Sequence, residues 1–502
     1  MTLSATLHLH TSHVSSPVDP LVFGGFLEHM GRAVYGGIFD PASPRADEHG
    51  CRTDVLEALR GLNLTAMRYP GGNFASGYHW LDGVGPSASR PVVRDLAWRS
   101  TEPNTFGTHE FLDLCERMAW TPMLTVNLGT GTPEEARSWL EYCNAPTGTR
   151  WGDLRAANGR TEPWNVRLWC LGNEMDGPWQ LGHVGAEEYA SRAHQAAQLM
   201  KAADPHVQTV ACGSSHPDMP TFMEWDHTVL HRLGRLADFV SLHRYVGNRS
   251  DDVADYLAVT NAIDEQIEKI DATCRHVRGA RKGRKRVYLA FDEWNVWYKT
   301  MTPGWDDGGW RVAPPIIEEV YDLADALVVA GFLQSFIRHA DVVKVANIAQ
   351  VCNVIAPVLT KPDDLLVQSI YHPFAMISSR RSGSSLRVAV EGPVYGAPSY
   401  GEAATLDASA ILSEKAVHVF CTNRSLYETL RVAVEFSGPG SKLISVESAE
   451  ILTGPSHDAR NTWEDRDVLG SRPFDGFSVV GSRLAAELPP LSFAAATARL
   501  DR

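Results

Sequence analysis

Two glutamates, Glu174 and Glu293, each follow an apolar run in this 502-residue chain. The runs are LWCLGNEMDGP (168–178) and VYLAFDEWNVWY (287–298), and both begin with the composition of a buried parallel strand. The first polar residues after such a strand mark its C-terminal edge, where an α/β barrel carries its reactive groups. A pair of carboxyl groups at this edge can act as acid, base or nucleophile on a glycosidic bond. The pattern therefore predicts an enzyme.

The neighbours of Glu174 suit a general acid. Asn173 precedes it, so that an amide and an acid can reach the same substrate. Met175, Pro178 and Trp179 predict an apolar wall, which favours a protonated carboxyl group.

The neighbours of Glu293 suit a nucleophile instead. Hydrogen-bond donors from Arg68, Asn173 or Tyr245 would keep its carboxylate ionised. Because side chains alternate along a strand, Asp292 is expected to face the barrel wall and Glu293 the interior.

Polar or aromatic residues follow nearly every predicted strand. Taken singly, each has a structural explanation, such as a loop cap for Asn127, but together they would line one concave site. The stretches are 28–29, 68–73, 127, 173–174, 214–216, 243–245, 293–295 and 347–350. Aromatic rings that can stack on sugars are those of Trp98, Trp179, Tyr245, Trp294 and Trp297, with core packing as the alternative for Trp294.

Eight strand-like runs alternate with helical patterns between residues 19 and 370, which predicts a (β/α)8 TIM barrel. The runs are 22–27, 64–68, 123–127, 166–171, 209–212, 239–243, 287–291 and 343–348. Helices are predicted over 133–142, 186–203 and 319–339. No GxGxxG follows the first strand, so a dinucleotide-binding sheet is disfavoured. Gly-rich stretches at 36–37 and 304–309 predict loops at the barrel mouth.

Residues 371–502 have a different pattern, in which helical periodicity gives way to short alternating runs separated by turns. This is typical of an antiparallel β-sandwich. The N-terminal segment 1–18 also alternates, and we expect its strand to pair with the C-terminal sheet.

Composition and charge exclude several classes of partner. A net charge of −14 argues against nucleic acid and against an anionic membrane surface. No apolar run is long enough to span a membrane, and no export signal is visible, so a cytoplasmic location is expected. Eight scattered cysteines without CxxC pairs predict buried free thiols.

Other hydrolytic chemistries lack their motifs. No HExxH or strand-end HxH is present, and His29, His216 and His243 have no matching carboxylate spacing, so no metal site is predicted. The absence of GxSxG excludes a serine nucleophile of the α/β-hydrolase type.

Three motifs resemble glycoside hydrolase family 51, chiefly α-L-arabinofuranosidases: GNEMDGPW (172–179), FDEWNVWY (291–298) and RYPGGN (68–73). FLEH (26–29) and DLAWRSTEPN (95–104) are similar to the same family. The likeness is greatest to compact intracellular bacterial members. It implies a retaining mechanism without a cofactor, with Glu174 as acid/base and Glu293 as nucleophile.

The resemblance also implies a substrate and an assembly. The expected partners are arabinofuranose-containing oligosaccharides and further copies of the chain, often in a hexamer. Arg68 and His243 would orient the catalytic pair. The implied substrate-binding residues are Glu28, Arg68, Asn73, Trp98, Asn173, His243, Tyr245, Trp297 and Gln350.

The implied activity is release of terminal non-reducing α-L-arabinofuranosyl units from arabinan or arabinoxylan oligosaccharides. The Trp- and Gly-containing stretches 78–83 and 304–310 would close the mouth into a pocket, and the loop 302–311 is where leaving-group preference would diverge. One alternative is a related barrel activity, namely an endoglucanase, β-xylosidase or galactofuranosidase. A non-catalytic carbohydrate-binding protein is the other.

Overall fold

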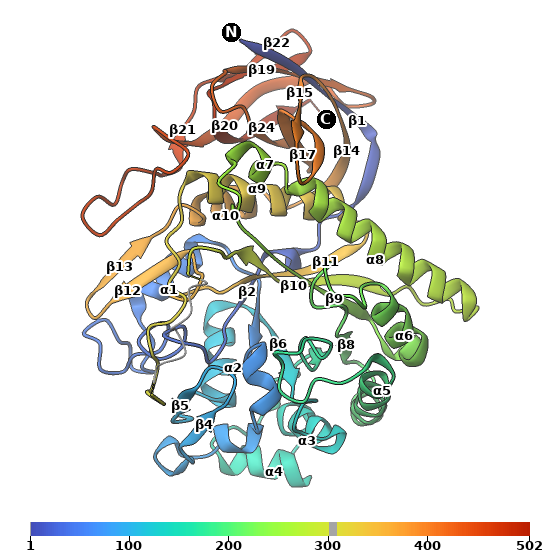
Figure 1. Cartoon of the computed structure of the whole chain (residues 1–502), viewed down its shortest axis with the longest axis vertical. Helices are drawn as coiled ribbons and strands as arrows, with labels where there is room; N and C mark the ends of the chain where they lie inside the picture. The colour runs from blue at the N-terminus through green and yellow to red at the C-terminus, as the bar shows by residue number, and fades with distance from the viewer. Residues whose placement is uncertain (1, 301–308, 502) are drawn as a thin grey trace.

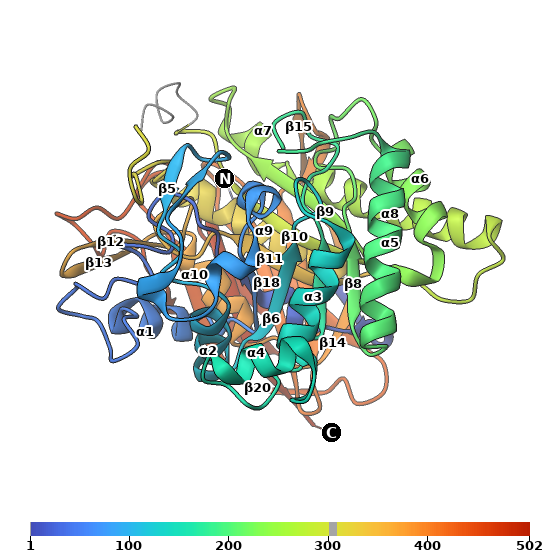
Figure 2. The same cartoon turned by 90° about the horizontal axis from the view of Figure 1, so that it is seen from below.

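The computed structural model describes residues 2–300 and 309–501. Eight parallel strands close into a barrel in the order β10-β11-β2-β3-β6-β7-β8-β9, surrounded by helices (Figure 2). The strands are β2 (Gly24–Phe26), β3 (Ala66–Tyr69), β6 (Thr121–Val126), β7 (Leu168–Leu171), β8 (Gln208–Ala211), β9 (Phe239–Val246), β10 (Tyr288–Val296) and β11 (Val343–Ala349). The predicted TIM barrel is confirmed, and each strand overlaps its predicted run.

Local sequence signals set the start of the predicted helix α3. Pro133 takes the first position of α3, and the Thr132 side chain accepts a hydrogen bond from the Glu135 amide. The predicted helix over 186–203 is α5. The helices are α1 (Thr53–Gly61), α2 (Thr108–Met118), α3 (Pro133–Asn144), α4 (Arg150–Ala157), α5 (Ala186–Ala203), α6 (Glu224–Leu233), α7 (Val253–Leu257), α8 (Thr260–Ala280), α9 (Leu323–Arg338) and α10 (Tyr371–Ser378).

Two helical predictions need correction. The helix expected over 319–339 begins only at Leu323, because Asp322 caps it by accepting a hydrogen bond from the Asp325 amide. Glu319 therefore lies in the segment before α9. Helix α10 occupies a stretch that was expected to lack helices, and its nearly continuous apolar sequence gives no amphipathic period that would reveal it.

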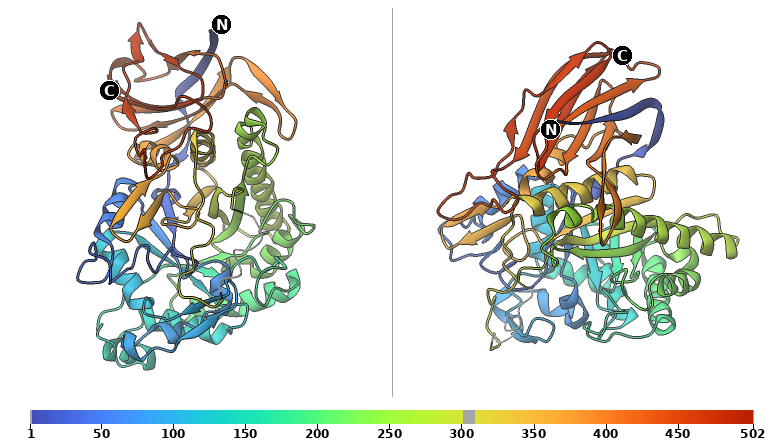
Figure 3. Two further views of the ribbon diagram at one scale, coloured as in Figure 1. Left: turned by 60° about the vertical axis from the view of Figure 1, so that its left-hand side comes forward. Right: turned by 45° about the horizontal axis from the view of Figure 1, so that its top comes forward.

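The C-terminal part forms a ten-stranded sheet in the order β21-β20-β24-β18-β17-β14-β1-β19-β23-β22. Strand β1 pairs antiparallel with β14 and parallel with β19, so the sheet is not wholly antiparallel. Both chain termini lie in this part of the molecule (Figure 3). The strands are β1 (Leu3–Pro17), β14 (Ser384–Glu391), β17 (Leu406–Leu412), β18 (Ala416–Asn423), β19 (Leu430–Ser437), β20 (Leu443–Thr453), β21 (Arg472–Pro473), β22 (Phe477–Val480), β23 (Arg483–Leu488) and β24 (Ser492–Leu500). Three further two-stranded pairs are β4 (Val93–Asp95) with β5 (Ser100–Glu102), β12 (Val358–Lys361) with β13 (Asp364–Val367), and β15 (Val394–Ala397) with β16 (Gly401–Ala404).

Helices α9 and α10 lie between the barrel and the large sheet (Figure 1). Helix α9 is buried along nearly its whole length, which is why its sequence is apolar on every side. Polar contacts also join the two parts, since Arg338 on α9 donates to Asp407 on β17 over 2.8 Å.

Several smaller expectations have clear outcomes. All eight cysteines are free and buried, as predicted. Among the described residues, no helix has both the length and the apolar composition needed to cross a membrane. Residues 302–308 of the predicted mouth loops 302–311, 304–309 and 304–310 lie outside the described residues.

Candidate active site

A cavity of about 580 Å³ opens at the C-terminal ends of the barrel strands. It collects side chains from strand ends and loops that are far apart in the sequence. Its walls are formed by Glu28, Met30, Gly72, Asn73, Ala97, Trp98, Glu174, Trp179, Ser215, His216, Tyr245, Arg249, Glu293, Trp297, Ile317, Gln350 and Ile355. Both catalytic candidates and six of the nine predicted substrate-binding residues are therefore at this cavity.

The remaining three predicted residues, Arg68, Asn173 and His243, do not line the cavity; Arg68 and His243 contact its carboxylates, and Asn173 contacts Arg68. Arg68 donates to Glu293 Oε1 over 2.6 Å and to Asn173 Oδ1 over 2.7 Å. Asn173 thus holds Arg68 and makes no hydrogen bond to Glu293. Tyr245 donates to the other Glu293 oxygen over 3.1 Å, so two donors hold this carboxylate.

Strand β10 carries a bulge that turns both Asp292 and Glu293 into the barrel. The register between β10 and β9 shifts between Ala290 and Glu293, and an extra residue at a bulge breaks the alternation of side chains. Phe291 and Trp294 point outward and pack on Phe332 and Phe336 of α9. The expectation that Asp292 faces the barrel wall is therefore wrong.

Asp292 contacts the basic groups under the site. Its carboxylate lies 3.4 Å from Arg68 Nε and 3.5 Å from His243 Nε2, and it accepts a hydrogen bond from Ser241 over 2.5 Å. Burial alone would raise the pKa of Asp292, but Arg68 and His243 outweigh it and the net shift is downward. Asp292 is thus a fixed negative charge.

A glycine allows the RYPGGN loop to pass close to these groups. A Cβ atom on Gly72 would lie 2.7 Å from Glu293 Oε1 and 3.2 Å from Asn173 Nδ2. Any side chain at residue 72 would displace the carboxylate or the amide.

Glu174 follows β7 in a strained backbone conformation, with φ of 41°. Such a conformation is costly for a residue other than glycine and is concentrated at functional sites. His243 Nδ1 lies 2.8 Å from Glu174 Oε1, and the Trp179 indole donates to Glu174 Oε2 over 2.5 Å. Trp179 was expected to form an apolar wall, but its polar edge contacts the acid.

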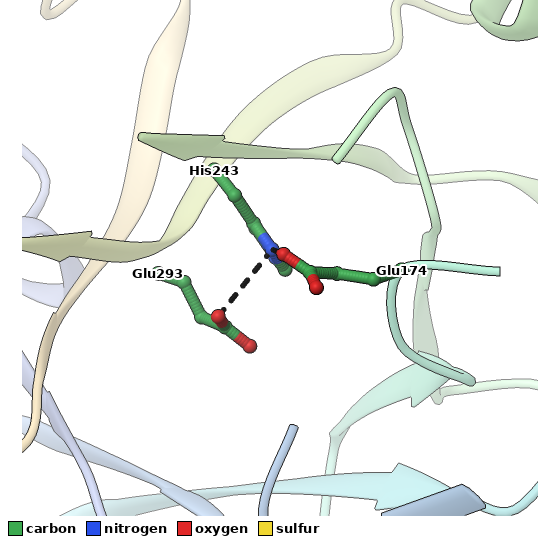
Figure 4. Close-up of side chains that lie close together, drawn as sticks. All are labelled: Glu174, His243 and Glu293. Atoms are coloured by element: carbon green, nitrogen blue, oxygen red, sulfur yellow. Dashed lines mark hydrogen bonds and ion pairs between the residues drawn. The ribbon is translucent and has the colours of Figure 1, made fainter. Parts of the chain in front are cut away.

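His243 lies between the two glutamates (Figure 4). Its Nδ1 atom is 2.8 Å from Glu174 and 3.5 Å from Glu293. Burial alone would lower the pKa of His243, but the charges of Glu293, Asp292 and Glu174 raise it to about 10. At neutral pH the ring is a cation that donates from both nitrogens.

The pKa of Glu293 is raised, because the carboxyl group is fully buried. His243 and Arg68 oppose the shift, and Glu174 adds to it. The short bond from Arg68 favours the ionised form, which is the form a nucleophile needs.

Glu28 and Gln350 form a second polar group on the cavity wall. The Glu28 amide donates to Gln350 Oε1 over 2.7 Å, and Gln350 Nε2 donates to Glu28 Oε2 over 3.0 Å. The Trp98 indole donates to Glu28 Oε1 over 3.0 Å. Burial, together with the nearby charge of Glu293, raises the pKa of Glu28 to about 7.

Comparison with known proteins identifies the family. The family model described as "Alpha-L-arabinofuranosidase C-terminal domain" matches residues 292–492, and "Alpha-L-arabinofuranosidase 1 domain" matches residues 58–256. An intracellular exo-α-(1→5)-L-arabinofuranosidase of Streptomyces lividans is 44% identical over 98% of this chain and 74% of its own length. An exo-α-(1→6)-L-arabinofuranosidase of Bifidobacterium longum is 39% identical over 96% and 94%.

A solved structure agrees with these relatives. It is a family 51 α-L-arabinofuranosidase from Bifidobacterium longum, with a TM-score of 0.94 and 35% identity over 99% of this chain and 100% of that one. This chain belongs to the family 51 α-L-arabinofuranosidases. The resemblance seen in its sequence motifs is confirmed, and the non-catalytic alternative is set aside.

Four aromatic side chains line the cavity of this arabinofuranosidase: Trp98, Trp179, Tyr245 and Trp297. Tyr245 and Trp297 pack edge to face with ring centroids 5.6 Å apart. Trp294 is instead part of the core around α9. The stretch 78–83 does not line the cavity, because Trp80 packs against Tyr142 and Trp151.

Sequence reasoning missed several members of the site. Ser241 donates to Asp292 and lies 2.9 Å from His243 Nε2; its place two residues before His243 on the same strand face is a signal that could have found it. Met30, Ile317 and Ile355 line the cavity from loops that carry no periodic pattern.

One atom each from Glu174, His243 and Glu293 lies within 4.8 Å of the others, a spacing that would suit a metal ion. His243 is protonated at neutral pH, however, and a metal would have to displace that proton. The same spacing suits proton transfer better.

Proposed function

We propose that this enzyme removes single α-L-arabinofuranosyl units from the non-reducing ends of oligosaccharides with retention of configuration. One observation carries the proposal: carboxylate oxygens of Glu174 and Glu293 face one cavity and approach within 4.8 Å. Retaining glycosidases hold their two carboxyl groups about 5–5.5 Å apart, whereas inverting enzymes need about 6.5–9.5 Å to admit a water.

In the first step Glu293 attacks the anomeric carbon of the arabinofuranosyl unit. The attacking oxygen is Oε2, because Tyr245 holds it more loosely than Arg68 holds Oε1. The C–O bond to the leaving group breaks as Glu174 transfers its proton to the departing oxygen. The product of this step is a covalent glycosyl ester on Glu293.

In the second step Glu174 takes a proton from water, which attacks the anomeric carbon and releases Glu293. Both Glu174 oxygens accept hydrogen bonds in the structure, as a general base does. For the acid step Trp179 must release Oε2, and this half-exposed indole has room to move. His243, a cation in the structure, donates to Glu174 and lies 3.5 Å from Glu293, so it stabilises negative charge on either glutamate.

The other predicted substrate-binding residues belong to the sugar subsite in this proposal. Glu28, Asn73, Trp98 and Gln350 all line the cavity, and Trp98 and Gln350 donate hydrogen bonds to Glu28. The relatives' names support arabinose as the sugar and include both 1→5 and 1→6 linkages. We also propose a cytoplasmic location and a boundary between the barrel domain and the C-terminal domain at residues 370/371. The proposed homo-oligomer is a hexamer, and light scattering tests it by measuring the molar mass in solution.

A panel of nitrophenyl glycosides tests the function, together with α-1,5- and α-1,6-linked arabino-oligosaccharides. The α-L-arabinofuranoside should be hydrolysed fastest, and the oligosaccharides should yield arabinose alone from the first turnovers. Faster hydrolysis of a glucopyranoside, xylopyranoside or galactofuranoside, or release of longer fragments, would assign one of the alternative activities instead.

A further inference from the structure

A buried carboxylate outside the catalytic group holds one wall of the cavity. Glu319 is fully buried and lies just before α9. Its Oε1 accepts hydrogen bonds from the Tyr298 amide over 2.9 Å and the Lys299 amide over 2.6 Å. Its Oε2 accepts from the Thr300 amide over 3.0 Å and from the Thr300 hydroxyl.

These donors replace the cation that a buried carboxylate ordinarily needs. Within residues 2–300 and 309–501, no Lys, Arg or His side chain forms an ion pair with Glu319. Three consecutive amides and a hydroxyl group satisfy the charge instead. Such an arrangement fixes the backbone of the donating segment, because each amide would lose its partner if the segment moved.

The donating segment begins directly after Trp297. The Trp297 amide continues the pairing with β9 by donating to Val246 over 2.8 Å, and its ring packs on Tyr245. Trp297 lines the cavity, whereas its indole Nε1 is buried and has no hydrogen-bond partner among the described residues. Because this nitrogen is out of reach of solvent, the ring carbons are the part of Trp297 that a bound sugar can contact.

Glu319 also joins this segment to two other residues of the cavity wall. The Glu319 amide and the Ile355 amide both donate to the Ile317 carbonyl over 3.0 Å. Ile317 and Ile355 line the same cavity as Trp297. A second link comes from Lys299, whose Nζ lies 2.7 Å from Asp322 and 2.6 Å from Asp325 at the start of α9.

We propose that Glu319 is a positioning residue, which fixes Trp297 so that its ring forms the part of the cavity wall that contacts the substrate. The inference rests on the proposed function, because it concerns the substrate of that cavity. Glu319 touches neither Glu174 nor Glu293, so its effect is on substrate binding rather than on the chemical step.

A double-mutant cycle with 4-nitrophenyl α-L-arabinofuranoside tests the link. Trp297→Ala removes the ring, while Glu319→Gln keeps one acceptor oxygen and places an NH2 group against Thr300. Each variant should raise KM about tenfold and leave kcat within about twofold, the pattern of lost ground-state binding. The double variant should have nearly the KM of Trp297→Ala alone, since both changes remove the same contact.

Two further variants keep the test decisive. Glu318→Gln is the matched control, because the neighbouring Glu318 pairs with Arg32 instead of the Trp297 segment, and its KM should equal that of wild type. If Glu319→Gln does not fold, Thr300→Val replaces it, removes only the hydroxyl donor and should raise KM about threefold. Multiplicative effects in the cycle, or a fall in kcat with KM unchanged, would overturn the inference.

The proposed function is tested by a measurement that does not involve the Glu319 variants. A wild-type enzyme that does not hydrolyse the arabinofuranoside refutes that function irrespective of the variants. Calorimetric titration with arabinose tests Glu319 without turnover: the Kd should rise about tenfold in Glu319→Gln, and a wild type that binds no arabinose would overturn the inference as well. Equal Kd values in wild type and variant would then reject the positioning role.

Discussion

The barrel interior consists of two layers that the same strands build from different chemistry. The lower layer is an apolar cluster of Met123, Leu168, Cys170, Val210, Phe239, Ala290 and Val345. The upper layer contains Arg68, His243, Asp292 and Glu293, which are equally buried but charged. Their ion pairs and hydrogen bonds offset the cost of burying these charges.

The contrast shows what each layer contributes. A lower-layer side chain stabilises the barrel through its volume, and the loss of that volume leaves a cavity. An upper-layer side chain acts through its charge and the position of its proton, for which no apolar residue of equal size can substitute. Substitutions in the upper layer should therefore change turnover, and those in the lower layer should change stability.

The largest effect is expected at Glu293. Glu293→Ala should reduce kcat for every substrate more than about 1,000-fold, a loss of more than ~4 kcal/mol, because no glycosyl ester can form. The variant should still fold, since Arg68 keeps Asp292 and Asn173 as partners, so the loss of turnover can be measured on folded enzyme. Steady-state kinetics with a nitrophenyl arabinofuranoside measures this loss of kcat. A smaller loss would show that Glu293 is not the nucleophile.

Glu174→Ala should have an effect that depends on the leaving group. Substrates with poor leaving groups, such as arabino-oligosaccharides, should lose about 100- to 10,000-fold in kcat/KM. Nitrophenyl substrates should lose far less in this parameter, because their leaving group departs with little protonation. A comparison of kcat/KM across leaving groups of graded pKa checks this, and equal losses for all of them would contradict an acid role.

His243→Gln should lower kcat about 10- to 100-fold and change the pH dependence of stability. The folded-state pKa of His243 is about 10, above its ordinary value of 6.5. The protonated ring thus adds stability that is fully present below pH 6.5 and is lost as the pH rises towards 10. In urea unfolding from pH 6 to 10, the decline in stability should be larger in wild type than in the variant by roughly 3–5 kcal/mol. Parallel curves for the two proteins would mean that His243 is not held as a cation.

The smallest effect on turnover is expected in the lower layer, at Leu168. It lies on β7, the strand that also leads to Glu174. Leu168→Ala should reduce the free energy of unfolding by about 2–5 kcal/mol through the cavity it leaves. The kcat of the folded enzyme should stay within about twofold of wild type. A large fall in kcat of the fully folded variant would show that the lower layer also determines turnover.

The barrel could be predicted because its strands are buried on both faces and stand out as apolar runs between amphipathic helices. The catalytic pair could be predicted for the same reason, since each glutamate ends such a run. The orientation of Asp292 could not, because a bulge depends on the register between β10 and its neighbours. The role of Glu319 could not be predicted either, because the sequence places it inside a helical pattern. Asp322 caps α9, so the helix begins after Glu319 and leaves its side chain to accept hydrogen bonds from amides.

Mass spectrometry of the Glu174→Ala variant tests the central claim most directly. Without a general base, an arabinofuranoside with a good leaving group should glycosylate the enzyme faster than water can release the sugar. The account predicts that peptide mapping will find one pentosyl unit attached to Glu293. Attachment to a different residue, or no attachment together with an inverted product, would contradict a retaining mechanism with Glu293 as nucleophile.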